Sequence, residues 1–327
     1  MSMLQFLENA EWDAPFFKRL ALNDTGQGRG HQAGMVFPKS LRRYLPTLNE
    51  AEANNNTPTV NRRLYVEMFI HTNPITESTV RYQLQTWGGT RLAESRLTDG
   101  LRPLRDQAGP GDIMIFQRKI DALDCFRLVL IKQGTPEFKE IKRQIDGHNW
   151  GVLNPRNVPI NQEQVGQAQA EITAITQEDF VVQRPHVIRL ETKQRRIARS
   201  SVFRERVRQE YGFRCAVSGF AITTPNRLQY EVESAHIVPV TENGPDDIRN
   251  GLTLTQTLHW AFDQGLFGIR ADRTIYVPDR VLEMPENNFL QQINNRRINE
   301  ARTETLRVHD DAFGWHMAHR VRKWDNA

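Results

Sequence analysis

Short runs of β-branched and aromatic residues alternate with polar turns over the first 132 residues of the chain. Each run is four to eight residues long and is bounded by turn residues, as is typical of strands. A succession of such strands predicts a β-rich, barrel-like domain over residues 20–132. The predicted strands are 64–70, 79–84, 112–116 and 125–131.

The pattern changes after residue 132, where polar stretches with helical spacing appear. We predict a short helix over 136–145 and a closing turn over 147–151. A stretch punctuated by prolines follows, in which residues 162–177 are rich in Gln, Ala and Glu; this is typical of a linker, here with a helix inside it. A chain of 327 residues has room for two domains. We therefore predict a first domain over 1–155, a linker over 156–194 and a second domain over 195–327.

Composition narrows the class of protein. Hydrophobic residues make up 39% and charged residues 25% of the chain, as in soluble globular proteins. The net charge of +4 and the pI of about 9.2 permit a polyanionic partner. Cys125 and Cys215 are too few for a disulfide framework or a four-cysteine zinc site. With no membrane-length apolar run and no secretory signal, we expect a cytoplasmic protein that has no membrane partner.

Two strand-like runs and a helix-like run between residues 231 and 263 carry the candidate chemistry. Asn250 follows His236 by 14 residues, and His259 follows nine residues later. On a helix, His259 and Asp263 share one face and could bind one metal ion. A neutral histidine can take a proton from water, and a metal ion can stabilise charge on a phosphodiester. The set predicts a phosphodiester-hydrolysing site in which His236 is the base, Asn250 holds its imidazole or completes the metal shell, and His259 and Asp263 bind Mg²⁺ or Mn²⁺.

A strongly basic segment lies just before this motif. Residues 193–208 contain seven basic side chains and one acidic side chain, Glu205. On a helix this density could be an ordinary exposed face. Its place before a phosphodiester site favours a phosphate-contacting surface that includes Arg196 and Arg199.

Two loops of the first domain carry candidate DNA-reading residues. The loop at 23–32 is glycine-rich and contains Arg29 and His31, so its backbone could approach a ligand closely, although a plain surface loop has the same composition. The loop at 87–96 contains Arg91, Glu94 and Arg96. Arginine can bind guanine and glutamate can bind the cytosine amino group, whereas the alternative is a solvated loop with local ion pairs.

The second domain resembles the HNH endonuclease family. The resemblance implies a ββα-metal fold in which His236 is the base and His259 a metal ligand. Ala235 stands where many members have a metal-binding Asp or His, so Asp263 would have to supply that ligand. Ser218 stands where a zinc-binding partner of Cys215 would be, so we expect no structural zinc. The matching segments are Cys215-Ala216-Val217-Ser218-Gly219, Ser234-Ala235-His236-Ile237-Val238-Pro239, Asn250-Gly251-Leu252 and Leu258-His259-Trp260-Ala261-Phe262-Asp263.

The first domain resembles the amino-terminal DNA-binding domain of EcoRII-type restriction endonucleases over residues 1–155. That domain is a β-pseudobarrel that grips the major groove of double-stranded DNA with two arms. The resemblance implies that His31 and the arm from Arg91 to Arg96 read bases, while Gly89 replaces a residue that is often basic. It is carried by residues 17–26, 30–38 and 89–96.

Together these features predict an α+β protein in which a β-pseudobarrel DNA-binding domain precedes a ββα-metal nuclease domain. Its predicted function is that of a restriction endonuclease, and cutting both strands suggests a homodimer. A modification-dependent nuclease, in which the same arms sense methylated cytosine, is a close alternative. Ala235 also leaves open a non-cutting DNA-binding regulator with a degenerate HNH fold.

Overall fold

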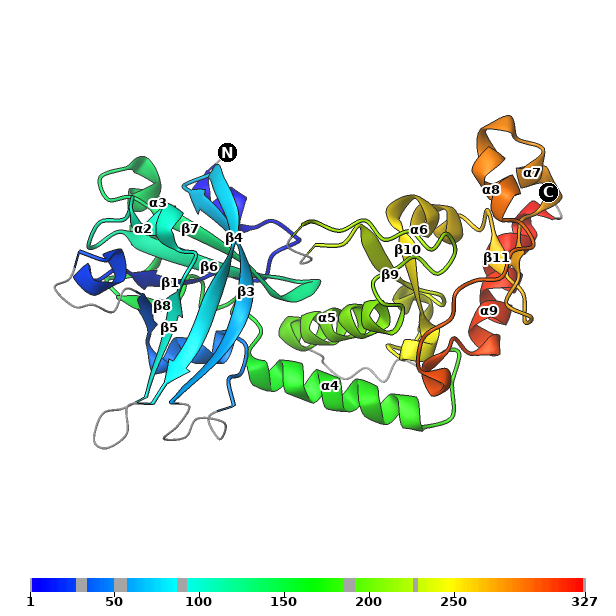
Figure 1. Cartoon of the computed structure of the whole chain (residues 1–327), viewed down its shortest axis with the longest axis horizontal. Helices are drawn as coiled ribbons and strands as arrows, with labels where there is room; N and C mark the ends of the chain where they lie inside the picture. Colours follow the sequence, from blue (N-terminus) through cyan, green and yellow to red (C-terminus); the bar gives the residue numbers. More distant parts are fainter. Residues whose placement is uncertain are drawn as a thin grey trace. The chain divides into compact units, whose positions relative to one another are not determined.

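The computed structural model describes residues 2–27, 34–49, 58–86, 93–184, 192–225 and 229–325 (Figure 1). The chain forms two compact units, Met1–Gly166 and Gln167–Ala327. The first unit is built around a large sheet, and the second unit combines helices with short strand pairs. The protein is therefore of the predicted α+β class.

The first unit contains one eight-stranded sheet with the order β2-β5-β4-β3-β7-β6-β1-β8. All of its pairings are antiparallel except β3 with β7, which run parallel. The sheet curls, as Figure 1 shows. Its strands are β1 (Phe16–Arg19), β2 (Met35–Phe37), β3 (Thr59–Ile70), β4 (Asn73–Gln85), β5 (Glu94–Thr98), β6 (Ile113–Lys119), β7 (Ala122–Ile131) and β8 (Trp150–Val152).

The two faces of this sheet bury separate hydrophobic cores, because successive side chains of a strand point to opposite faces. Phe16 belongs to one core, where its ring stacks on Phe116 with the centroids 5.1 Å apart. Its neighbour Phe17 belongs to the other core, together with Phe138 and Ile141. This second core includes side chains of α1 (Met3–Leu7) and α3 (Pro136–Gln144), so these helices cover one face of the sheet. The unit also contains α2 (Arg102–Arg105) and the 3-10 helices η1 (Leu22–Thr25) and η2 (Lys39–Tyr44).

The four predicted strands are present in the structure as β3, β4, β6 and β7, and the predicted helix over 136–145 is present as α3. The predicted closing turn over 147–151 is present in its first part, whereas its last two residues belong to the edge strand β8, which pairs with β1. Proteins place short strands at sheet edges, and three residues give little sequence signal.

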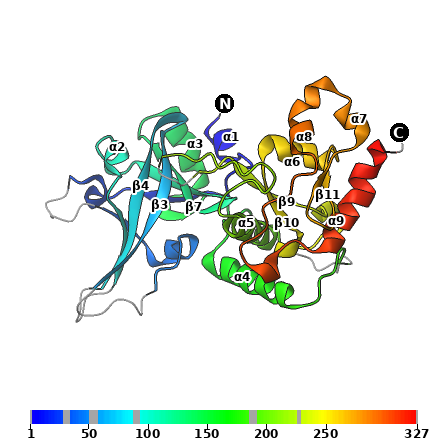
Figure 2. The same cartoon turned by 45° about the vertical axis from the view of Figure 1, so that its right-hand side comes forward.

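The second unit is centred on two antiparallel strands, β9 (Val232–His236) and β10 (Gly251–Thr255), followed directly by α6 (Gln256–Asp263). The long helix α5 (Lys193–Glu210) packs against both strands, as Figures 1 and 2 show. The predicted ββα arrangement is therefore present. The unit also contains β11 (Gly268–Ile269), β12 (Ile275–Tyr276), α7 (Asp279–Leu282), α8 (Asn288–Ile293), α9 (Asp310–His316) and a π-helical segment η8 (Met317–Val321).

The predicted linker contains α4 (Gln162–Gln177), the helix expected at that place. Glu171 in its second half accepts a hydrogen bond from Arg195 of α5 at 2.6 Å. The Arg249 guanidinium donates to the backbone oxygens of Ile175 and Glu178 at 3.2 and 2.9 Å. The end of α4 is therefore attached to the second unit. Among the described residues, no helix is long and apolar enough to cross a membrane.

Candidate active site

The strand β9 presents its side chains alternately to two helices. Ser234 and His236 face α5, since the Ser234 hydroxyl donates to the backbone oxygen of Arg204 at 2.7 Å and the His236 ring stacks on Phe203. Glu233 faces α6, where its carboxylate contacts His259. The pleat of one strand thus divides the candidate site into two groups on opposite faces of the hairpin.

His236 is held by an acidic residue that the sequence analysis did not identify. Its Nε2 atom lies 2.9 Å from Oδ1 of Asp246. A carboxylate can only accept, so Nε2 carries the proton, and the neutral ring then has its lone pair on Nδ1. The Phe203 ring lies parallel to the imidazole, with the centroids 3.9 Å apart, and fixes the plane of the ring. This arrangement suits a general base.

Asp246 also pairs with a basic residue of α5. Its Oδ2 atom lies 2.9 Å from Nη2 of Arg199. Burial raises the pKa of the Asp246 carboxyl, but the hydrogen bond to His236 and the Arg199 guanidinium outweigh burial and hold this pKa below its usual value. Asp246 is therefore ionised near neutral pH and can orient His236.

Asn250 is fully buried and holds the loop between the two strands. Its side-chain oxygen accepts from the backbone NH of Val238 at 2.9 Å, and its side-chain nitrogen donates to the backbone oxygens of Val238 and Pro245, both at 3.0 Å. Its side chain is thus engaged with the loop backbone, whereas the imidazole of His236 contacts Asp246. The hydrogen bonds of the Asn250 side chain thus go to the loop that carries Asp246 and not to the His236 imidazole, which the sequence analysis gave as one of its two possible partners.

The residue after Asn250 must be small. A Cβ atom at Gly251 would lie 2.4 Å from a methyl carbon of Val207 and 3.1 Å from the Phe203 ring. Glycine therefore lets β10 approach α5 closely enough for Phe203 to reach His236.

His259 forms the second group with two carboxylates. Its Nδ1 atom lies 2.8 Å from Oε2 of Glu233, and its Nε2 atom lies 3.6 Å from Oδ2 of Asp263. The predicted sharing of one helix face by His259 and Asp263 is present. Glu233 was not identified from the sequence. It lies two residues before Ala235 on the same face of β9, so it brings a carboxylate to the side on which Ala235 has none.

The electrostatics of this group fit a cation. With Nδ1–H donating to Glu233, the Nε2 lone pair of a neutral His259 faces a carboxylate oxygen of Asp263, and both are electron donors. Burial raises the pKa of the Asp263 carboxyl, a protonated His259 and Arg320 would lower it, and Glu233 raises it further; the pKa remains above its usual value. A bound cation would relieve the repulsion between Glu233 and Asp263. Within the described residues, no three His, Cys, Asp or Glu side chains already form a metal cage, so an ion here would also need water or phosphate oxygens as ligands.

Some arginines of the basic helix α5 pair with carboxylates, and at least one other is exposed at the surface. Arg195 and Arg199 pair with the carboxylates of Glu171 and Asp246. Arg196 is exposed. Of the two residues predicted on this helix to bind phosphate, Arg196 is at the surface and Arg199 lies beside the candidate base.

The DNA-reading residues predicted in the first unit are only partly described. Arg29, His31 and Arg91 lie outside the described residues. Glu94 and Arg96 are neighbours on one face of β5, and the Arg96 guanidinium pairs with the Glu94 carboxylate, with Nε 3.2 Å from Oε2. Arg96 is buried. In this state the two candidate base readers bind each other, as in the alternative of local ion pairs.

The motif before the glycine-rich loop has a structural role. Asp24 is buried, and its carboxylate forms a 2.5 Å ion pair with Lys18. The same carboxylate accepts from the backbone NH groups of Ala21 at 2.8 Å and Val36 at 3.1 Å. Asp24 thereby joins the end of β1 to β2 and sets where the intervening loop begins and ends.

Cys215 lies in a buried turn next to the ββα unit. Its sulfur accepts a hydrogen bond from the backbone NH of Ser218 at 3.4 Å. The NH of Ala216 donates to the Thr253 oxygen of β10 at 2.7 Å, and the NH of Asn299 donates to the Ala216 oxygen at 2.8 Å. Backbone bonds to β10 and to Asn299 thus support the turn.

Comparisons with known proteins match both halves of the chain. Residues 215–270 match the family of HNH endonucleases, and residues 10–132 match the N-terminal domain of the restriction endonuclease EcoRII. The chain joins an EcoRII-type N-terminal domain to an HNH endonuclease domain. It is a DNA endonuclease of restriction type, as the sequence analysis predicted.

The EcoRII-type match covers nearly the whole curled sheet, and the HNH match covers both strands and the helix that carry His236, Asn250, His259 and Asp263. A search of the curated proteins gave no significant match. Among solved structures, the modification-dependent restriction endonuclease TagI is similar, with 14% identity, a TM-score of 0.28, and coverage of 92% of this chain and 80% of that chain.

Proposed function

We propose that the EcoRII-type domain selects a short site in double-stranded DNA and that the HNH domain hydrolyses a phosphodiester there with Mg²⁺ or Mn²⁺. The observation that carries this proposal is the pairing of an oriented base with a separate donor set on one hairpin. His236 is fixed by Asp246 on one face of β9, and His259 lies between Glu233 and Asp263 on the other.

In the proposed reaction, His236 takes the proton from the attacking water at Nδ1. Asp246 keeps the proton of the ring on Nε2 and stabilises the imidazolium that forms. Asn250 keeps Asp246 in place through the loop backbone, and Phe203 prevents the ring from rotating. Each of these residues acts through the position or charge of His236.

His259 and Asp263 are the proposed metal ligands, and Glu233 either joins them or orients His259 through Nδ1. The ion, when bound, stabilises the charge that develops on the phosphate and the leaving oxygen. Arg196 and the other exposed basic residues of α5 would contact the DNA backbone, and Arg29, His31, Arg91, Glu94 and Arg96 remain the proposed base readers. For Glu94 and Arg96, binding would require their mutual ion pair to open.

One HNH site cuts one strand, so we propose that two copies of the chain act together when both strands are cut. Sedimentation of the protein with and without DNA tests this part of the proposal. A protein that stays monomeric on DNA while it cuts both strands would contradict it.

The central test is the His236→Ala variant. It should fail to cut plasmid DNA in Mg²⁺ or Mn²⁺ and should bind DNA like the parent protein in EDTA. His319→Ala is a matched control, because His319 is exposed and lies outside the ββα unit. If His236→Ala cuts as fast as the parent, His236 is not the base.

A further inference from the structure

The two ends of the curled sheet border one cavity of about 800 Å³ in the first unit. Its lining comes from β8 at one end of the sheet order, β1 beside it, and β2 at the opposite end. Asp24 bridges this seam, because its carboxylate binds both Lys18 of β1 and the backbone of Val36 in β2. The cavity therefore lies where the sheet curls without closing.

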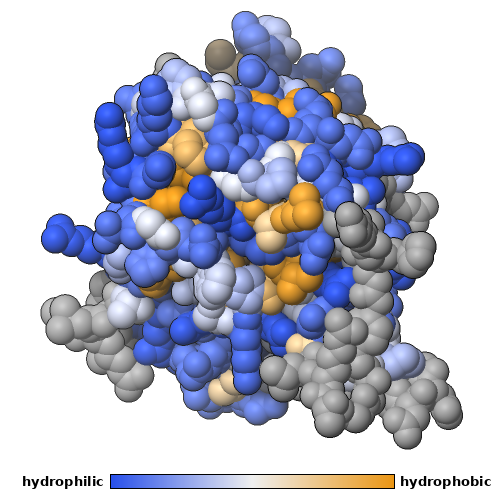
Figure 3. Space-filling model, turned by 90° about the vertical axis from the view of Figure 1, so that its left-hand side faces the viewer, coloured by the Kyte–Doolittle hydropathy of each residue, from blue (hydrophilic) through white to orange (hydrophobic). Residues whose placement is uncertain are grey.

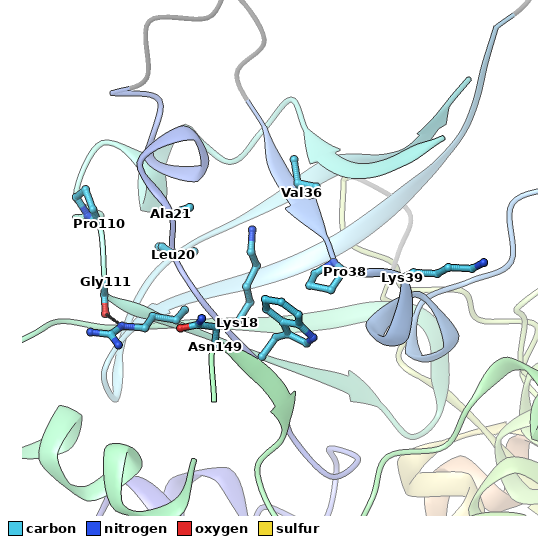
Figure 4. Close-up of a pocket in the computed structure, with 11 residues that line it drawn as sticks. Lys18, Leu20, Ala21, Val36, Pro38, Lys39, Pro110, Gly111 and Asn149 are labelled. Carbon is cyan, nitrogen blue, oxygen red and sulfur yellow. Dashed lines mark hydrogen bonds between the residues drawn. The ribbon is translucent and has the colours of Figure 1, made fainter. Parts of the chain in front are cut away.

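The lining combines apolar surface with cations at the border. Figure 4 shows Leu20 and Ala21 on one side of Lys18, with Val36 and Pro38 on the other. Lys39 extends outward from the cavity in the same view. Arg19 lines the cavity and donates to the Gly111 oxygen at 3.3 Å. The lining residues are Lys18, Arg19, Leu20, Ala21, Val36, Pro38, Lys39, Pro110, Gly111, Asn149 and Trp150, and none of these described residues is acidic.

Trp150 is the most unusual member of this lining. Its side chain is 47% exposed, although tryptophan is highly buried on average. It lies directly opposite Lys18 in the β1–β8 pairing. Hydrophobic surface also interrupts the hydrophilic side chains on the face of the molecule in Figure 3. An exposed indole beside aliphatic side chains offers a flat surface for stacking.

We propose that this cavity takes up one unstacked nucleobase of the bound DNA, with Trp150 as its stacking surface and Arg19 and Lys39 near the flanking phosphates. Every nucleobase has an aromatic face that can stack on a side chain, and the phosphates beside it need cations. The volume is within the range that holds a small organic group. An apolar side chain from a second copy of the chain would use the apolar lining but not the two cations.

The place of the cavity in the chain supports this occupant. Its walls at Ala21 and Val36 lie on either side of the loop that contains Arg29 and His31. Described residues that precede and follow this segment in the sequence therefore border the cavity. The inference rests on the proposed binding of DNA by this unit. It adds that one base of the bound DNA leaves the stack and binds in the cavity.

The test compares two short DNA duplexes of the same length and sequence context, one fully paired and one with a single mispaired base. Binding is measured by fluorescence anisotropy in EDTA, so that no cutting occurs. A mispaired base has already lost part of its pairing energy, so the parent protein should bind that duplex at least about tenfold more tightly. Trp150→Ala should bind both duplexes equally, and Trp150→Phe should keep the preference, because a phenyl ring still stacks.

Ile75→Ala is the matched control, since Ile75 is another exposed apolar residue of the same unit that does not line the cavity. It should behave like the parent protein. Equal binding of both duplexes by the parent, or a preference that survives in Trp150→Ala, would overturn the cavity proposal and leave DNA binding intact. Failure to bind either duplex would overturn the proposed DNA binding of the unit as well.

Discussion

The Asp246 carboxylate joins two residues of different elements, because it accepts from Nε2 of His236 on β9 and binds Arg199 on α5, each at 2.9 Å. A carboxylate in this position determines which nitrogen of the imidazole carries the proton. It also ties the candidate base to the basic helix.

Replacing Asp246 by Asn tests its role in positioning His236. The amide can keep a hydrogen bond but not the charge that stabilises an imidazolium, so kcat should fall about 10- to 100-fold. The KM for DNA should change little, because Asp246 is proposed to act through His236 and not on the substrate. Single-turnover cleavage with saturating metal measures the effect.

Glu286→Gln is the control for this variant, since Glu286 is exposed and remote from the ββα strands. A parallel rise in KM and loss of thermal stability in Asp246→Asn, with kcat unchanged, would show that Asp246 only supports the fold.

Metal affinity distinguishes the roles of the two carboxylates near His259. Asp263→Asn should weaken Mn²⁺ binding about 10- to 100-fold, because a proposed ligand loses its charge. Glu233→Gln should weaken it to a similar degree if Glu233 is a ligand, and less if Glu233 only orients the ring. Titration calorimetry with Mn²⁺ measures both without DNA. If neither variant changes the affinity, the ion binds elsewhere.

Stability should depend on pH through His316, whose ring stacks on Phe262 with the centroids 3.6 Å apart. Burial lowers the pKa of His316 to about 3, although the hydrogen bond to the Phe262 oxygen opposes this shift. The unfolded chain therefore takes up a proton near pH 6.5 that the folded state does not bind. Neutral His316 therefore contributes fully to the free energy of unfolding above that pH. As the pH drops toward 3, this contribution falls by about 1.4 kcal/mol for each pH unit.

Urea unfolding between pH 7 and pH 4 measures this contribution. His316→Leu should show a shallower loss of stability in acid than the parent, because the variant has no group to protonate at this place. Equal slopes for the two proteins would mean that other groups dominate acid unfolding.

Digestion of matched methylated and unmethylated DNA separates the two forms of the restriction activity. A nuclease that reads unmodified bases should cut the unmethylated DNA, whereas a modification-dependent nuclease should cut only the methylated DNA. Sequencing the fragment ends identifies the site in either case. Cutting of methylated DNA alone would exclude the first form.

The local parts of the site could be predicted from the sequence. His236, Asn250, His259 and Asp263 lie within 28 consecutive residues, so strand and helix periodicity place them on β9, directly before β10, and on α6. The sharing of one helix face by His259 and Asp263 follows from their spacing alone.

The residues that contact these side chains in the folded protein could not be predicted from sequence spacing. Asp246 lies in an irregular loop, where no period predicts the direction of a side chain. Glu233 could have been found from strand alternation, since it shares a face with Ala235, but an exposed acidic residue in a strand is common. The parallel pairing of β3 with β7 joins segments far apart in the chain, and no local pattern specifies it.

The hydrogen-bond register of the hairpin limits where this nuclease can accept insertions. Five residue pairs hold β9 against β10, from His236 opposite Gly251 to Val232 opposite Thr255. A slip of one residue would turn each β9 side chain to the other face, so that His236 would face α6 and Glu233 would face α5. Such a molecule could keep its fold and lose its chemistry. Insertions should therefore be tolerated in the outer loops of the domain but not within these five pairs.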